Sequence, residues 1–126
     1  MKRKILSVDD SAIARIMTKG GIEALGYEFL EASDGQEALD VLANKGSEIA
    51  LILLDWSMPG MNGLEFLIII KADSRYKEIP VMVVTTESEK TSIIKAIQLG
   101  VSNYLLKPFE EEDLKRKINA CLPYRK

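Results

Sequence analysis

The sequence predicts a doubly wound α/β fold, in which one five-stranded parallel sheet carries five helices on its two faces. Short apolar runs with the length of buried strands alternate with longer segments whose apolar residues recur at helical spacing, giving five strand–helix units in succession. The most apolar run, residues 49–54, contains no polar residue, as expected for a central strand that is covered on both faces. Strands joined through a helix that crosses the sheet run parallel to one another. Such crossovers are expected to be right-handed.

Length and composition narrow the possible functions. The 126 residues suffice for one hydrophobic core, so we expect a single domain over residues 1–126. A net charge of −2 without a basic stripe argues against nucleic-acid binding. Acids interrupt the first apolar run too early for a signal peptide or membrane span, so we expect a cytoplasmic protein. With Cys121 the only cysteine and no histidine, intramolecular disulfides and histidine-dependent zinc or triad chemistry are excluded.

The first unit is a strand over residues 4–8 followed by a helix with Ser11 as its N-cap. The helix is predicted by apolar residues at helical spacing, which are Ile13, Ile16, Met17 and Ala24. Gly20 and Gly21 should each lower the stability of the helix by roughly 1 kcal/mol relative to alanine, so its second half should be bent or weak. Gly26 is a natural end for it.

The second unit is a strand over residues 27–32, whose two glutamates favour the edge of the sheet. Asp34 and Glu37 then have the spacing of a capping box at the start of a helix that extends to about Lys45. The third unit is the central strand and a helix over residues 63–72, with one face formed by Leu64, Leu67, Ile68 and Lys71. Ile69 falls off that face, either on a loosely patterned core helix or in an apolar contact patch.

In the fourth unit, Pro80 opens a strand that ends on Thr85, and a helix terminated by Gly100 follows, marked by Ile93, Ala96 and Ile97. The fifth unit is a strand over residues 103–106, which ends on Lys107-Pro108, and a final helix marked by Leu114, Ile118, Cys121 and Leu122. Acidic residues lie at the positive end of this helix, where its macrodipole favours them.

Polar residues gather at the predicted carboxyl ends of the strands: Asp9 and Asp10 after the first, Asp55 after the third, Thr85 after the fourth and Lys107 after the fifth. In an open parallel sheet these ends share the edge where ligands bind. Clustered carboxylates repel one another unless a cation lies among them, and oxygen ligands without histidine or cysteine favour Mg²⁺. Each residue taken singly has a structural explanation, but the set suits phosphoryl transfer with Asp55 as the nucleophile.

These motifs resemble the response-regulator receiver domain of two-component signalling, particularly its stand-alone chemotaxis type. The resemblance runs from about residue 4 to residue 122 and rests on four motifs: Asp9-Asp10, Asp-Trp-Ser-Met-Pro-Gly-Met-Asn-Gly at 55–63, Val-Val-Thr at 83–85 and Tyr-Leu-Leu-Lys-Pro-Phe at 104–109. It implies a flavodoxin-like fold with strand order 2-1-3-4-5. It also implies a cis peptide bond before Pro108.

The resemblance assigns a role to each site residue. Asp55 would accept a phosphoryl group from a phosphohistidine on a histidine kinase. Asp10, Asp55 and the backbone carbonyl of Ser57 would bind Mg²⁺, and Asp9 would help through bound water. Lys107 would pair with the phosphoryl oxygens.

A two-state switch is implied as well. Thr85 would move to bind the phosphoryl group and Tyr104 would turn inward, so that the surface of the fourth helix, fifth strand and fifth helix binds a downstream protein. Thr86 is bulkier than the small residue usual at its position, which should narrow access to Asp55. Ser57, Thr86 and Glu87 would tune the phosphoryl lifetime. Trp56, beside Asp55, should report Mg²⁺ or phosphoryl analogues by fluorescence.

Three other classes of protein fit the sequence less well. A Mg²⁺-dependent phosphatase of the haloacid dehalogenase type needs Asp-x-Asp at the nucleophile, and Ser57 stands at the second position. A flavin-binding protein would need a phosphate-cradling loop where Asp9-Asp10 would repel the phosphate. A phosphate-independent binding module is disfavoured by the intact set Asp10, Asp55, Thr85 and Lys107. We expect a monomeric switch whose output, whether a motor protein, a phosphorelay to a phosphotransfer domain or a kinase, is left open.

Overall fold

The structure is a computed structural model that describes residues 3–122, apart from the side chains of Glu87 and residues 90–92. Five parallel strands form one sheet in the order β2-β1-β3-β4-β5. Their bounds are β1 (Lys4–Val8), β2 (Glu28–Ala32), β3 (Ile49–Asp55), β4 (Val81–Thr85) and β5 (Asn103–Leu106). The predicted fold class and strand order are confirmed, including the position of the glutamate-bearing second strand at an edge.

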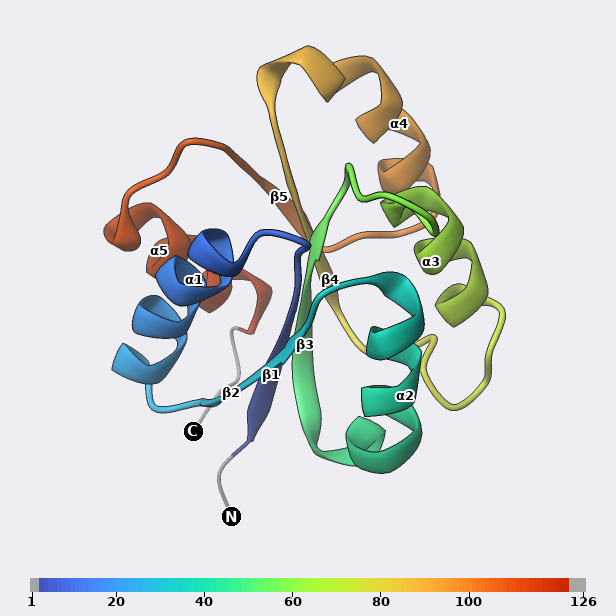
Figure 1. The fold of residues 1–126 in the computed structure, drawn as a ribbon, viewed down its shortest axis with the longest axis horizontal. Helices are drawn as coiled ribbons and strands as arrows, with labels where there is room; N and C mark the ends of the chain where they lie inside the picture. Colours follow the sequence, from blue (N-terminus) through green and yellow to red (C-terminus); the bar gives the residue numbers. More distant parts are fainter. Residues whose placement is uncertain (1–2, 123–126) are drawn as a thin grey trace.

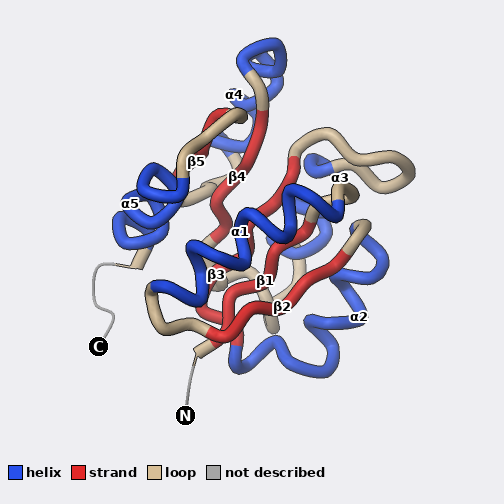
Figure 2. The backbone as a smooth tube through the Cα atoms, turned by 60° about the vertical axis from the view of Figure 1, so that its left-hand side comes forward, coloured by secondary structure: helices blue, strands red, loops and turns tan. Residues whose placement is uncertain are grey.

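Helices cover both faces of the sheet. They are α1 (Ala12–Ala24), α2 (Gly35–Lys45), α3 (Gly63–Lys71), α4 (Lys90–Gln98) and α5 (Glu111–Cys121). Figure 1 shows α1 and α5 on one face and α2, α3 and α4 on the other, and in Figure 2 α1 lies across the strands of its face. No helix in the described part of the chain is long and apolar enough to cross a membrane.

The two faces of β3 build two separate hydrophobic cores. Leu51 and Leu53 pack on the side of α1 and α5, whereas Ile52 and Leu54 pack on the side of α2, α3 and α4. Every residue of β3 is buried, as the uninterrupted apolar run predicted. Burial of each leucine or isoleucine side chain of β3 contributes about 1.5 to 3 kcal/mol relative to exposure. Asp55 therefore ends a strand that is anchored in both cores.

The apolar residues that predicted α1 do not face the core. The exposed fractions of Ile13, Ile16 and Met17 are 73%, 68% and 48%. The buried side of α1 is formed instead by Thr18, Gly21 and Ile22. A Cβ atom on Gly21 would lie 2.7 Å from Cδ2 of Leu114, so the missing side chain lets α5 approach closely. The helix runs unbroken to Ala24, so the two glycines do not interrupt it.

The predicted face of α3 was also wrong in part. Its buried residues are Gly63, Phe66, Leu67 and Ile70, whereas Ile68 is exposed. Successive helical residues point about 100° apart, so only one of three consecutive isoleucines can face the sheet. The predicted exposure of Ile69 is confirmed. In α4, Ile93 and Ala96 are buried as expected, but Ile97 is exposed.

Local signals placed most helix ends correctly. The hydroxyl of Ser11 accepts a hydrogen bond from the backbone N–H of Ala14, as predicted for an N-cap. Asp34 caps α2 through the N–H of Glu37, but the Glu37 carboxylate accepts from Ser33, so the reciprocal half of the predicted capping box is absent. Two capping boxes were not predicted: one at α3, between Asn62 and Glu65, and one at α5, between Glu110 and Asp113. Gly26 and Gly100 end their helices with φ of +90°, which glycine adopts without strain.

Candidate functional site

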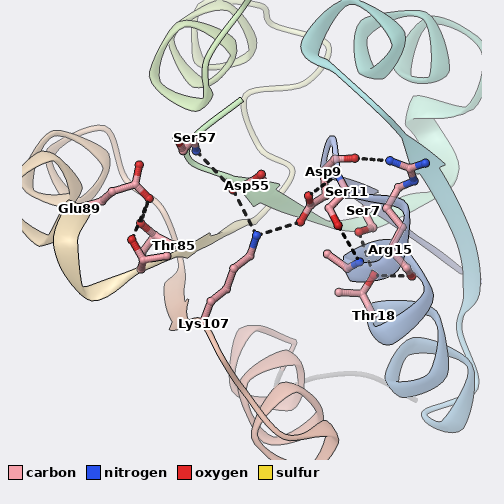
Figure 3. A network of polar contacts seen from close by, with 12 residues as sticks. Ser7, Asp9, Ser11, Arg15, Thr18, Asp55, Ser57, Thr85, Glu89 and Lys107 are labelled. Carbon is pink, nitrogen blue, oxygen red and sulfur yellow. Dashed lines mark hydrogen bonds and ion pairs between the residues drawn. The ribbon is translucent and has the colours of Figure 1, made fainter. Parts of the chain in front are cut away.

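The carboxyl ends of four strands bring the predicted polar residues to one edge. Asp9 directly follows β1, Asp55 is the last residue of β3, Thr85 is the last residue of β4, and Lys107 follows β5. The register of the central strands sets this arrangement, because β3 pairs with both β1 and β4. The peptide bond from Lys107 to the following proline is cis, as the resemblance implied. Figure 3 shows the side chains that meet at this edge.

Three carboxylates form the centre of the site. One oxygen from each of Asp9, Asp10 and Asp55 lies within 4.8 Å of the other two. Asp9 and Asp55 are buried, and Asp10 is exposed. The backbone N–H of Ser11 donates to Asp9 Oδ1 at 2.9 Å, and that of Ser57 donates to Asp55 Oδ1 at 3.3 Å. Two of the three acids are thus held in fixed orientations by the turns that follow their strands.

Lys107 supplies a positive charge to this cluster. Its Nζ lies 3.3 Å from Asp9 Oδ2 and 3.6 Å from Asp55 Oδ1. The single ammonium does not balance the acids, because burial and then the charge of Asp9 raise the pKa of Asp55 to about 7, while Lys107 and the Ser57 N–H act in the opposite direction. The carboxylate that should act as nucleophile is therefore destabilised in its charged form.

This arrangement fits a hard divalent cation. A cation among the three carboxylates would remove the repulsion that raises the pKa of Asp55, and their oxygen atoms are the ligands that Mg²⁺ prefers. Asp9, Asp10 and Asp55 are the side chains able to hold it. The backbone N–H of Ser57 contacts Asp55. That the backbone carbonyl of Ser57 binds the ion stays a prediction.

The residues assigned to switching, Thr85 and Tyr104, lie on the paired strands β4 and β5. The Thr85 side chain is buried, and its hydroxyl donates to Glu89 Oε1 at 2.9 Å. Tyr104 is half-buried on β5, packs at the border of the core under α3 and α4, and has Lys117 Nζ 5.1 Å from its ring centroid. The side chain of Thr86 is half-buried. The side chain of Glu87 lies outside the described residues, so its predicted role is untested.

Sequence reasoning missed two residues of the network. Arg15 donates from Nη1 to the backbone carbonyl of Asp9 and from Nε to Glu31 Oε1, the latter at 2.7 Å. It thereby ties the end of β1 to edge strand β2. Glu89 was overlooked as well, although it accepts from Thr85. Its place four residues after a strand-end hydroxyl, at the start of a helix, was the available signal.

Trp56 is buried next to Asp55. Its backbone carbonyl accepts from the N–H of Gly63, and a Cβ atom on Gly63 would lie 2.8 Å from Trp56 Cα. The turn after β3 therefore closes on itself and needs glycine at this position. A buried indole in such a fixed turn supports the predicted use of Trp56 fluorescence as a reporter of the site.

Known proteins are similar to this chain in sequence and in architecture. Residues 5–119 match the response regulator receiver domain family. The chemotaxis protein CheY1 of Helicobacter pylori is 42% identical over 120 residues, which cover 94% of this chain and 96% of that protein. A CheY homolog of Campylobacter jejuni is 41% identical over 120 residues, which cover 94% of this chain and 92% of that protein. The structure of the chemotaxis response regulator CheY4 of Vibrio cholerae matches with a TM-score of 0.85 and 32% identity, covering 96% and 99%. The chain therefore belongs to the response-regulator receiver domain family.

Proposed function

We propose that this protein is a phosphorylation-activated signalling switch in which Asp55 accepts a phosphoryl group from a phosphohistidine of a histidine kinase. The observation that carries the proposal is the position of Asp55, which is 5% exposed at the end of the central strand with Lys107 Nζ 3.6 Å from its carboxylate. Family membership and the CheY names of the relatives support it. In this proposal residues 1–126 form a single receiver domain.

The transfer is an in-line displacement at phosphorus. An oxygen of the Asp55 carboxylate bonds to the phosphorus, the P–N bond to the donor imidazole breaks, and the imidazole leaves with the bonding electron pair. Lys107 would contact the phosphoryl oxygens, a role that its ion pairs with Asp9 and Asp55 support. Hydrolysis later transfers the group to water and restores the carboxylate. The protein is thus a switch that assists its own phosphorylation rather than an enzyme acting on a separate substrate.

The acidic cluster makes the reaction metal-dependent in this proposal. Asp9, Asp10 and Asp55 would hold Mg²⁺ together with the backbone carbonyl of Ser57, and the ion would supply charge neutralisation for the phosphoryl oxygens. Asp55 has to be ionised to attack, and its raised pKa opposes ionisation at neutral pH unless a cation lies among the acids. Side chains at Ser57, Thr86 and Glu87 would tune access of water and hence the phosphoryl lifetime.

The output is a protein-binding surface on α4, β5 and α5. Phosphorylation would draw the Thr85 hydroxyl toward Asp55 and let Tyr104 turn inward, which changes this surface. Ile94 and Ile97 on α4 are exposed, and they offer the apolar contact that a partner would use. The relatives named as chemotaxis proteins favour a partner in chemotaxis or a related pathway. A cytoplasmic monomer that binds neither nucleic acid nor membrane completes the proposal.

Intact mass after incubation with Mg²⁺ and a small acyl-phosphate donor tests the chemistry. We expect one phosphoryl adduct on the wild-type protein, no adduct with Asp55→Ala or with chelated metal, and an unchanged adduct with Asp40→Ala, which removes an exposed acid on α2. Stable incorporation in Asp55→Ala would contradict the assignment of the site. No adduct on the wild type, together with no response of Trp56 fluorescence to a phosphoryl analogue, would favour a phosphate-independent binding module.

A further inference from the structure

The hydroxyl of Thr85 is already committed to an acceptor inside the protein. A hydroxyl group has a single proton to donate. In this structure Thr85 donates it to Glu89 Oε1 at 2.9 Å, and in Figure 3 the hydroxyl points to Glu89 while Lys107 contacts Asp55. The same hydroxyl would have to donate to a phosphoryl oxygen after phosphorylation. The two acceptors therefore compete for one hydrogen bond.

We propose that Glu89 is a restraining residue, which holds the domain in its inactive conformation by binding the Thr85 hydroxyl until a phosphoryl group on Asp55 displaces it. This inference rests on the proposed function, because it assumes that Asp55 is phosphorylated. It assigns to Glu89 control over how readily the domain switches.

The backbone around Thr85 leaves the side chain as the moving part. Thr85 is 1% exposed and ends β4, where its carbonyl accepts from the N–H of Lys107 at 2.7 Å. Its main chain is thus fixed between β4 and the segment that carries Lys107. Exchange of the acceptor has to come from rotation of the side chain, from displacement of Glu89, or from both.

The short turn after β4 presents Glu89 to this hydroxyl. Glu89 ends the 3-10 turn Glu87–Glu89, and its N–H donates to the carbonyl of Thr86 at 3.1 Å. The Thr86 hydroxyl lies 3.4 Å from the same Glu89 oxygen and 2.8 Å from the hydroxyl of Ser88. Two threonine hydroxyls therefore converge on one carboxylate, which stabilises the turn in the restrained arrangement.

A carboxylate is a strong competitor in this exchange. Hydrogen bonds to an ionised acceptor are roughly twice as strong as those between neutral groups. Glutamine at position 89 would keep an oxygen acceptor but remove its charge, whereas alanine would remove the acceptor. The restraint should therefore weaken in the order wild type, Glu89→Gln, Glu89→Ala. The affinity for a phosphoryl analogue should rise in the same order, because breaking the Thr85–Glu89 hydrogen bond is linked to binding of the analogue.

Affinity for beryllofluoride, a phosphoryl analogue, measures the restraint without turnover. Trp56 fluorescence would follow its binding in the presence of Mg²⁺. We expect about tenfold tighter binding for Glu89→Ala and about threefold for Glu89→Gln, in line with the loss of a charge-assisted hydrogen bond. Glu78→Ala removes an exposed acid from the loop before β4 and is the matched control for net charge, with unchanged affinity expected. Equal affinities for wild type and both Glu89 variants would overturn the proposal.

A double-mutant cycle separates the hydrogen bond from simple charge repulsion. In a Thr85→Val background the hydroxyl is gone, so Glu89→Ala should no longer change the affinity. If Glu89→Ala tightens binding equally in that background, the carboxylate acts by repelling the analogue and the restraint is disproved. If the wild-type protein binds no beryllofluoride while remaining folded, the proposed function itself fails, which is a different result from equal affinities among the variants.

The restraint also has a signature in the metal-free protein. The γ-methyl group of Thr85 reports the rotamer of its side chain in NMR spectra. We expect Glu89→Ala to change the rotamer population of Thr85 without Mg²⁺ or beryllofluoride, and Glu78→Ala to leave it unchanged. A Thr85 rotamer that is the same in wild type and Glu89→Ala would show that Glu89 does not hold the hydroxyl.

Discussion

At the scale of single residues, the site depends on how one carboxylate is surrounded. Asp55 lies at the end of a strand whose residues are all buried, with a second buried acid, Asp9, directly after the neighbouring strand β1 and one lysine close by. Burial is the largest cause of its raised pKa, followed by the charge of Asp9. The interactions that suit this residue to bind a cation therefore make the metal-free protein less stable.

The loss of stability caused by the buried Asp55 carboxylate depends on pH. The pKa of Asp55 is about 7 in the folded protein, compared with 3.8 for an ordinary aspartate. At a pH between these two values the folded state therefore retains a proton that the unfolded state has lost. The free energy of unfolding should consequently fall as pH rises from about 4 to about 7.

Asp55→Asn should remove this dependence. Without Mg²⁺ at pH 8, we expect the variant to be more stable than wild type by about 2 kcal/mol, and most of this gain should disappear near pH 4. Urea denaturation at the two pH values, in the presence of a chelator, measures the difference. Asp40→Asn is the control, and equal slopes of stability against pH for wild type and Asp55→Asn would contradict the assigned cause.

At the scale of elements, α1 shows that an apolar pattern identifies a helix but not its buried side. Ile13, Ile16 and Met17 are spaced as a helical face, yet they are exposed, and α1 packs through Thr18, Gly21 and Ile22 instead. The reason is the approach of α5, which needs glycine at position 21. Apolar residues left on the outer side are available for contacts that the domain itself does not make.

The two adjacent glycines of α1 should respond oppositely to alanine. A Cβ atom on Gly20 would lie 3.0 Å from Oε1 of Glu111, the end of a flexible side chain, so Gly20→Ala should stabilise the protein by about 0.5 to 1 kcal/mol through helix propensity. A Cβ atom on Gly21 would lie 2.7 Å from Cδ2 of the fully buried Leu114, and Gly21→Ala should destabilise by about 1 to 3 kcal/mol.

Thermal unfolding of the two variants against wild type measures these changes. Stabilisation by both substitutions would show that α5 shifts at little cost, so that the close approach at Gly21 is not needed. Destabilisation by both would show that neither position tolerates a Cβ atom. The clash with α5 would then outweigh the gain in helix propensity at both positions.

At the scale of the whole molecule, the site links metal binding to folding. Asp9 and Asp10 follow β1 and Asp55 ends β3, so the oxygen atoms of the three acids are close only in the folded sheet. A ligand that binds only the folded state stabilises it by about 2.7 kcal/mol at one hundred times its dissociation constant.

Mg²⁺ should therefore raise the unfolding temperature of the wild-type protein progressively with its concentration at pH 8. We expect the increase to be strongly reduced in Asp55→Asn, because one charged ligand is lost, and unchanged in Asp40→Asn. Differential scanning calorimetry over a series of Mg²⁺ concentrations makes the comparison. An unfolding temperature that does not respond to Mg²⁺ in wild type would remove the metal from the proposal.

The local sequence determined the elements and their order. Buried runs without polar residues, caps such as Ser11 and terminal glycines act over a few residues, so they could be recognised without knowing the fold. The alternation of strands and helices then restricted the sheet to parallel connections, and the resemblance supplied its order. Acids, a hydroxyl and an ammonium at successive strand ends were enough to predict one site, because parallel strands bring their carboxyl ends to the same edge.

Only the tertiary structure decided which helical faces are buried and which further side chains contact the residues of the site. The contact of Gly21 with Leu114 joins residues far apart in the sequence, and no local pattern shows that α5 comes so close. The same holds for Arg15, which reaches the carbonyl of Asp9 and Glu31 on a neighbouring strand. The contact of Thr85 with Glu89 is short in sequence but depends on how the turn after β4 folds. Such contacts follow from packing in three dimensions, which spacing along the chain does not determine.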